Sequence, residues 1–245
     1  MNAPSNEVVN VLCMKWGTKY SADYVNTLYA MVSRNLSREF RFVCLTEDAR
    51  GLDKKIEVFP LPEIAVSLDG PERGWNKLAV FSETLYDLKG KVLCLDLDLV
   101  ITGSLDDLFD CPGEVMIIKD WIKKDGTGNS SVYRFEIGAH PEVLAEFERS
   151  FEQIKQTHRN EQEYLSAMLM QKNALVYWPQ AWCRSFKRHC IKPFSLFIAR
   201  ETEMPEDTRV LVFHGKPDPH EAVAGVSGKW YRRFKPATWV TEHWH

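Results

Sequence analysis

The sequence predicts a single α/β domain, built on a mostly parallel central sheet flanked by helices. Short apolar runs typical of buried strands alternate with segments whose apolar residues recur at helical spacing. This alternation is the pattern of strand–helix–strand units, which place helices on both faces of a parallel sheet. Polar residues follow several of these strands, and ligands of such sheets bind near the carboxyl ends of the strands. No repeat or linker divides the chain, so one domain over residues 1–245 is expected.

The first half of the chain is expected to supply strands and two helices. Apolar runs predict strands at 8–14, 40–46, 56–61 and 92–100. Helical spacing predicts a helix over 21–36, with Ser21 as its N-cap. A second stripe, over 75–88, predicts a helix that ends at Gly90.

The second half of the chain shows the same alternation of predicted strands and helices. Apolar runs predict strands at 114–120, 174–179 and 209–215. Pro141 occupies a tolerated first-turn position of a predicted helix over 141–156. A further helix is predicted over 160–172, where Asn160 and Glu163 resemble a capping box.

Composition limits the classes of function. Basic and acidic residues number 31 and 34, so the net charge of −3 gives no basic footprint and no nucleic-acid partner is expected. The start of the chain lacks the basic and apolar pattern of a leader, and no apolar run is long enough to span a membrane. We therefore expect a cytoplasmic protein. The six cysteines form no CxxC pair and are expected to be free thiols.

Asp96 and Asp98 are the strongest candidates for chemistry. They follow the apolar run at 92–95, and their spacing on a strand would place both carboxylates on one face. Carboxylates are the hard ligands that Mg²⁺ and Mn²⁺ prefer, although a solvated strand end has the same pattern. His214 ends another strand and could add a third ligand if the strand ends converge, which would favour Mn²⁺ over Ca²⁺. A lone surface histidine is the alternative.

The order of motifs resembles the metal-dependent glycosyltransferases of the A-type fold, especially glycosyltransferase family 8 and its galactosyltransferase and glycogenin-like relatives. The likeness runs from Val8 to about Pro217. Its parts are VLCMKWGTKYS, FRFVCLTED, the WNKL opening of a helix, the run into Asp96-Leu97-Asp98, a strand NSSVYRF at 129–135, the pair Glu161-Gln162 and VFHGKP.

The resemblance implies a single Rossmann-like glycosyltransferase domain that moves a sugar from a nucleotide sugar, in most cases a UDP-sugar, to a glycan or glycolipid acceptor. Asp96, Asp98 and His214 would hold Mn²⁺ or Mg²⁺. Ser130 would face the donor sugar, and Glu161 and Gln162 would lie at the reacting sugar carbon. The resemblance favours retention of the anomeric configuration. Other residues implied to contact the nucleotide sugar are Lys15, Trp16, Gly17, Tyr20, Glu47, Asp48, Lys77, Leu97, Gly215 and Lys216.

Two departures from the family pattern concern the closing loop and the catalytic pair. The family has a gap between His-Gly and Lys-Pro-Trp, whereas this chain has HGKP followed by Asp218. Glu161 stands where the family has Asp. Two rival hypotheses remain for Asp96 and Asp98: a haloacid-dehalogenase-type phosphatase, whose motif normally starts the domain, and a carbohydrate or nucleotide-sugar binding module without turnover.

Two basic segments have alternative interpretations. Residues 184–192 contain four basic side chains and a histidine, among Trp182, Phe186 and Pro193, and could meet a diphosphate or an anionic acceptor, or form a solvated loop. We interpret residues 218–245 as a basic and aromatic extension of the domain. It could make a peripheral contact with an anionic membrane, or its aromatic residues could pack onto the domain.

Overall fold

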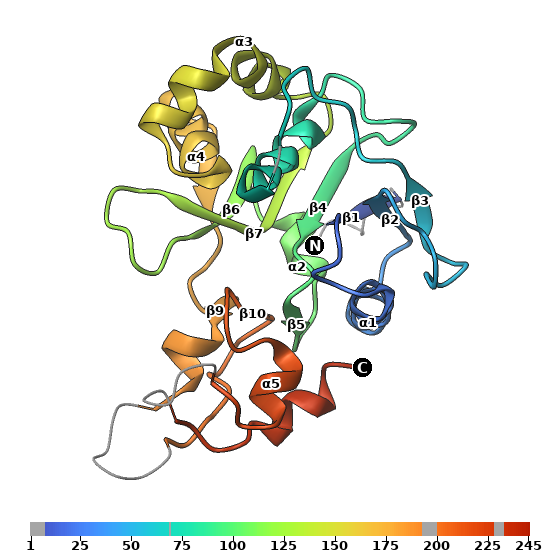
Figure 1. Ribbon diagram of the computed structural model, residues 1–245. Coiled ribbons are helices and arrows are strands. Elements are labelled where there is room, and N and C mark those ends of the chain that lie inside the picture. Colours follow the sequence, from blue (N-terminus) through green and yellow to red (C-terminus); the bar gives the residue numbers. More distant parts are fainter. Residues whose placement is uncertain (1–7, 69, 193–199, 228–232) are drawn as a thin grey trace.

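The computed structural model describes residues 8–68, 70–192, 200–227 and 233–245. Its main feature is a seven-stranded sheet in the order β3-β2-β1-β4-β7-β6-β8 (Figure 1). β1 lies parallel to β2 and β4, β2 to β3, and β6 to β8, while β7 runs antiparallel to both β4 and β6. The predicted α/β class with a mostly parallel sheet is therefore confirmed. The strands are β1 (Val9–Lys15), β2 (Phe40–Thr46), β3 (Glu57–Phe59), β4 (Lys91–Leu95), β6 (Val115–Lys119), β7 (Gly128–Glu136) and β8 (Leu175–Tyr177).

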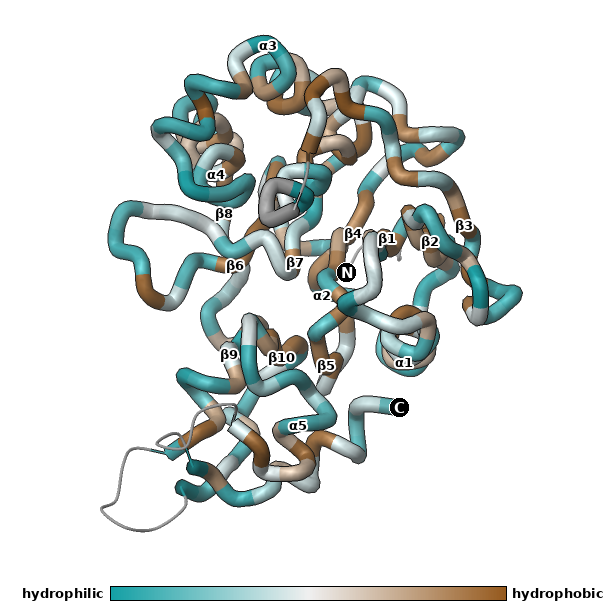
Figure 2. Tube along the Cα trace, in the orientation of Figure 1, coloured by the Kyte–Doolittle hydropathy of each residue, from teal (hydrophilic) through white to brown (hydrophobic). Residues whose placement is uncertain are grey.

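Helices cover both faces of this sheet because its strands are apolar on both faces. In β1, Val11 belongs to the core that also contains Leu28 of α1, whereas Leu12 belongs to a second core with Phe147 of α3. Figure 2 shows apolar residues along β4 and β5 and polar residues on the outer turns of α3 and α4. The helices are α1 (Ala22–Asn35), a 3-10 helix (Gly70–Phe81), α2 (Asp106–Asp110), α3 (Pro141–Thr157), α4 (Glu161–Gln171), a π-helix (Phe186–Cys190), α5 (Pro219–Val223) and a 3-10 helix (Thr238–Glu242).

A second, three-stranded sheet lies beside the first and was not expected from the sequence. It consists of β5 (Leu99–Ile101), β10 (Val210–Val212) and β9 (Cys183–Ser185), with β10 in the centre. β10 runs antiparallel to β5 and parallel to β9. The predicted continuous strand over 92–100 is wrong, because the chain leaves the large sheet at Leu95 and enters the small one at Leu99 (Figure 1).

Two predicted helices differ in detail. The segment 75–88 does not form the predicted helix: a 3-10 helix ends at Phe81, and turns follow. Its apolar stripe is nevertheless buried, with Leu78 and Leu88 in one core. In α4 the side chain of Asn160 accepts a hydrogen bond from the backbone N–H of Glu163. Glu163 accepts from the N–H of Arg159 instead of that of Asn160, so only half of the predicted capping box forms.

The last segment of the chain packs partly against α1. The Tyr24 hydroxyl lies 2.9 Å from His220 Nδ1, and Arg34 donates a 2.8 Å hydrogen bond to the carbonyl oxygen of His243. Phe234 is buried, and Trp239 packs against the same core. Lys229, Trp230, Tyr231 and Arg232 of the predicted membrane-contacting tail lie outside the described residues. Membrane contact stays a prediction; no helix among the described residues is long and apolar enough to cross a bilayer.

Cysteine chemistry follows the expectation. All six cysteines are free thiols, and five of them are buried. Burial raises the pKa of Cys94 to about 12, so this thiol stays protonated at neutral pH.

Candidate active site

Asp96 and Asp98 lie in the short loop that joins the two sheets. The N–H of Asp96 donates to the carbonyl oxygen of Ser131 at 3.0 Å, which ties the loop to β7. The carbonyl oxygen of Asp98 accepts from the N–H of Phe213 at 3.1 Å, which ties it to the end of β10. The two carboxylates are thus positioned by both sheets and not, as predicted, by one strand face. Leu95, Leu97 and Leu99 between and beside them are buried.

Both carboxylates have a polar partner from another part of the chain. The ammonium group of Lys77 lies 2.5 Å from Asp96 Oδ1, and the hydroxyl of Tyr20 donates to Asp98 Oδ2 at 2.8 Å. Burial and the nearby charge of Asp96 raise the pKa of Asp98 to about 6. Burial alone would lower the pKa of Lys77, but the charges of Asp96 and Glu161 outweigh it and raise the pKa. Excess negative charge is therefore concentrated here.

The two aspartates line a cavity of about 400 Å³, which we call the carboxylate cavity. It lies where β7, the first turn of α4 and the segment after β10 meet, so residues distant in sequence share one wall. Its lining consists of Lys77, Asp96, Asp98, Asp120, Trp121, Ile122, Asn129, Ser130, Ser131, Asn160, Glu161, Gln162, His214 and Gly215.

A second cavity of about 260 Å³, the tyrosine cavity, shares Lys77, Asp96, Asp98 and Glu161 with the first. It is bounded by the loop after β1, where Lys19 lies over the ring of Tyr20 at 4.4 Å. Its remaining lining residues are Met14, Trp16, Lys19, Tyr20, Gly74 and Leu97. Asp96 and Asp98 therefore line both the carboxylate cavity, which is rich in polar groups, and the tyrosine cavity, which is bounded by aromatic side chains.

Glu161 and Gln162 meet Ser130 on the wall of the carboxylate cavity. Glu161 Oε1 accepts a 3.0 Å hydrogen bond from the Ser130 hydroxyl, and Gln162 Oε1 accepts a 3.3 Å bond from the Ser130 N–H. Asn160 begins α4 just before them, which directs both side chains towards β7. These three predicted residues are therefore brought together.

His214 reaches the same cavity, but its ring is engaged elsewhere. Its Nε2 lies 2.7 Å from the Ser185 hydroxyl, and its ring stacks on Trp121 with 5.6 Å between centroids. Burial and the charges of Lys187 and Arg188 lower the pKa of His214 to about 4, so the imidazole is neutral at pH 7. A neutral imidazole is the form that binds metals.

Within the described ranges, the acidic and histidine side chains whose ligand atoms gather within 4.8 Å are Asp218, His220 and Glu221. The predicted trio of Asp96, Asp98 and His214 is not gathered this closely. The ammonium group of Lys216 lies 2.7 Å from both Asp218 Oδ2 and Glu221 Oε1, so it already supplies a cation to that cluster. These two acids also form the capping box of α5.

Several residues predicted at the nucleotide do not line either cavity. Lys216 is held by its two ion pairs. Glu47 accepts from the N–H of Gly17 at 2.8 Å and pairs with Arg73, so it shapes the loop after β1. Hydrogen bonds and the nearby Arg50 lower the pKa of Asp48. Lys15 is buried at the end of β1.

Sequence reasoning missed Asp120 and Trp121, whereas Lys19 lies in the recognised motif VLCMKWGTKYS but was not singled out. Asp120 directly follows β6 as Asp96 follows β4, and Trp121 comes next. The rule that ligands bind at the carboxyl ends of strands would therefore have pointed to both. Ser185 had no such signal, because β9 is only three residues long.

The fold has close counterparts among solved structures. A galactosyltransferase, LgtC, in complex with donor and acceptor sugar analogues aligns with 95% of this chain and 94% of its own, at a TM-score of 0.62 and 16% identity. An active-site mutant of LgtC aligns over the same shares at 0.63 and 14%. The bifunctional glycosyltransferase WbbM aligns with 89% of this chain and 48% of its own, at 0.61 and 13%.

No protein-family profile matches the chain, and no curated protein sequence matches it. At these identities the structural likeness concerns the fold. It covers both sheets and the helices that flank them, since nearly the whole chain is aligned. The chain therefore has the A-type glycosyltransferase fold that its motifs implied.

Proposed function

We propose that this protein is a metal-dependent glycosyltransferase that moves a sugar from a nucleotide sugar, most simply a UDP-sugar, to a saccharide acceptor. The observation that carries the proposal is the convergence of Asp96, Asp98, Ser130, Glu161 and Gln162 on one cavity that joins a second, aromatic one. The fold shared with LgtC, whose structure holds donor and acceptor analogues, supports it.

The donor set fits a hard divalent cation such as Mn²⁺. Burial and the nearby charge of Asp96 raise the pKa of Asp98 to about 6, and a bound cation would favour the ionised carboxylate again. Asp96 and Asp98 would hold the ion, and His214 would join them if its Nε2 leaves Ser185. The metal would neutralise the charge that develops on the diphosphate when it leaves.

The chain's own side chains would bind and orient the donor. Trp16 and Tyr20 in the tyrosine cavity offer aromatic faces to the nucleoside base, and Lys77, between the two cavities, offers a charge to the diphosphate. Ser130 holds Glu161 and Gln162 at the opposite wall, where the sugar carbon would lie. Retention of configuration is proposed for the reaction.

The test is a thermal-shift panel of UDP- and GDP-sugars with and without Mn²⁺. We expect synergy between one donor and Mn²⁺ in the native protein, none in Asp98→Ala, and full synergy in Asp87→Ala, a control at an exposed carboxylate that lines neither cavity. Slow donor hydrolysis would separate an enzyme from a binding module. Lack of synergy with every donor would refute the proposal.

A further inference from the structure

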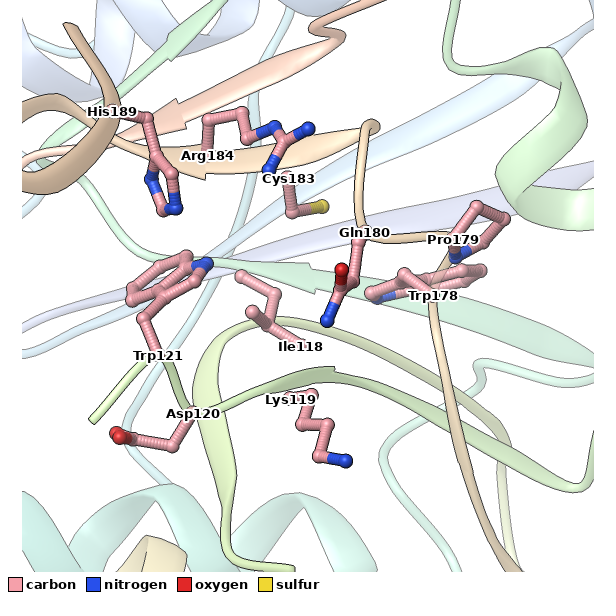
Figure 3. Close-up of a pocket in the computed structure, with 10 residues that line it drawn as sticks. All are labelled: Ile118, Lys119, Asp120, Trp121, Trp178, Pro179, Gln180, Cys183, Arg184 and His189. Carbon is pink, nitrogen blue, oxygen red and sulfur yellow. The ribbon is translucent and has the colours of Figure 1, made fainter. Parts of the chain in front are cut away.

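A third cavity, of about 200 Å³, adjoins the carboxylate cavity. The two share Asp120 and Trp121 as lining residues. Figure 3 shows its walls, which come from the end of β6, the segment after β8 and β9. We call it the arginine cavity; its lining consists of Ile118, Lys119, Asp120, Trp121, Trp178, Pro179, Gln180, Cys183, Arg184 and His189.

Arg184 is the notable side chain of this cavity. Its Nε atom is buried and has no hydrogen-bond partner. Among the described residues, no ion pair or hydrogen bond to its guanidinium is found. A buried N–H without a partner costs about 1–3 kcal/mol, so an unpaired guanidinium that faces a cavity indicates a missing acceptor.

The neighbouring basic residues have other roles, so the basic segment 184–192 is not one uniform patch. Lys187 donates to the carbonyl oxygen of His214, and Lys192 pairs with Glu203. Arg188 is exposed and does not line the cavity. Arg184 is thus the basic residue of this segment that is placed to meet a ligand inside the cavity.

The charges around the cavity favour an anion. Burial and the charges of Arg184 and Arg188 lower the pKa of His189. The carboxylate of Asp120 accepts hydrogen bonds from the N–H groups of Ile122 and Lys123 at 2.7 and 2.8 Å, and in Figure 3 it points away from Arg184. The one acid of the lining is therefore directed elsewhere.

The remaining lining suits a sugar ring. Trp121 offers an aromatic surface, Trp178 lines the cavity although it is largely buried, and the amide of Gln180 extends into the space below Arg184 (Figure 3). Trp121 also stacks on His214 of the carboxylate cavity, so it forms the partition between the two cavities. A molecule held here would lie next to the site of sugar transfer.

We propose that the arginine cavity binds an acidic sugar of the acceptor, a saccharide that carries a carboxylate or phosphate group, and that Arg184 binds its oxyanion. The inference rests on the proposed function in taking this saccharide as the acceptor. The planar guanidinium can donate two parallel hydrogen bonds to either group. Arg184 would therefore set the specificity for acidic acceptors, while the reaction itself would depend on the carboxylate cavity.

Binding of simple sugars tests the inference without any turnover. Methyl glucuronide, glucose 6-phosphate and methyl glucoside would be titrated by ligand-observed NMR into the native protein, Arg184→Met and the matched control Arg188→Met. We expect one or both acidic probes to bind at least about tenfold more tightly than the neutral glucoside, as a charge-assisted hydrogen bond provides. Which acidic probe binds separates a carboxylate from a phosphate ligand.

The two arginine variants show which side chain causes the preference for acidic sugars. Arg184→Met should abolish the preference for acidic probes, whereas Arg188→Met should keep it. Arg188→Met should unfold at the temperature of the native protein, because Arg188 is exposed and has no partner among the described residues. Arg184→Met should unfold at that temperature or above it, because it removes a buried N–H that has no partner. Equal binding of acidic and neutral sugars, no binding of either acidic probe, or a preference that survives Arg184→Met would overturn the inference.

Titration of UDP and Mn²⁺ into the same three proteins separates this inference from the proposed function. If the native protein binds UDP but shows no preference for acidic sugars, only the inference about Arg184 is refuted. A preference for acidic sugars without binding of any UDP- or GDP-sugar of the thermal-shift panel would refute the transferase and leave an acidic-saccharide site.

Discussion

Asparagine in place of Asp98 should stabilise the metal-free protein. The pKa of Asp98 is raised from 3.8 to about 6, because burial and Asp96 disfavour its charged form. At about 1.4 kcal/mol per pKa unit, this difference corresponds to about 3 kcal/mol. Because the folded-state pKa lies above the unfolded one, the protonated form favours folding, and this advantage is lost as the pH rises through 6. At pH 8 the native protein thus bears the full penalty.

Asp98→Asn removes that penalty and keeps an oxygen that can accept the hydrogen bond from Tyr20. We expect its free energy of unfolding, from urea titration at pH 8 with EDTA, to exceed the native value by about 1–3 kcal/mol. The gain should shrink towards pH 4. Asp87→Asn is the matched control, because a hydrogen bond from Arg41 lowers the pKa of Asp87 and its ionised form is favoured.

The same urea titration with Mn²⁺ in place of EDTA tests whether Asp98 belongs to the proposed metal site. Added Mn²⁺ should stabilise the native protein and should leave Asp98→Asn unchanged. If Asp98→Asn is less stable than the native protein at pH 8 without metal, the ionised Asp98 carboxylate does not destabilise the fold. That result would mean that the carboxylate is favourably solvated or paired.

Three further predictions concern the scaffold. Burial would raise the pKa of Glu163, but hydrogen bonds from Lys123 and Arg159 lower it to about 2. Glu163→Gln should therefore cost about 1–3 kcal/mol above pH 5, with the loss fading as the pH falls from 4.5 towards 2; denaturant titration across this range checks the sign. Arg134 is buried and donates to the carbonyl oxygens of Leu108, Phe109, Cys111 and Gly113. Arg134→Met should cost about 3 kcal/mol in the same assay, and an unchanged stability would contradict the role of these bonds. Gly138 has a φ of +78° and an added Cβ would lie 2.7 Å from the carbonyl oxygen of Glu83. Gly138→Ala should lower the thermal midpoint, whereas Gly74→Ala, whose Cβ would lie 3.7 Å from Glu161, should not.

The central sheet could be predicted because its strands carry a strong local signal. The limits of β2 match the predicted 40–46, and β1 lies within one residue of its predicted ends. β7 also lies within one residue of the strand at 129–135, which the family resemblance and not a local pattern predicted. The small sheet could not be predicted in this way. Its strands are three residues long, and β5 continues an apolar run that already looked like one strand. Only the pairing with Val210–Val212, far along the chain, separates it from β4.

The candidate site could likewise be predicted in part. Asp96, Asp98, Ser130, Glu161, Gln162, Gly215 and His214 share one cavity, and their motifs were recognised in the sequence. The direction of individual side chains could not be read from those motifs. Lys216 pairs with Asp218 and Glu221, and that pairing depends on where α5 begins. The separate roles of Arg184, Arg188 and Lys192 likewise depend on the local structure, since Arg184 lies in β9, Arg188 in the π-helix and Lys192 after it.

The hydrogen bond between the Phe213 N–H and the Asp98 carbonyl oxygen has a consequence for how the protein matures. The loop that holds the two aspartates has a free carbonyl oxygen until β10, more than a hundred residues later, pairs with β5. Contacts between such distant segments form late, because they close long loops. A partly synthesised chain therefore completes the strands of the large sheet by Tyr177, before Phe213 is available to bind the loop of the two aspartates.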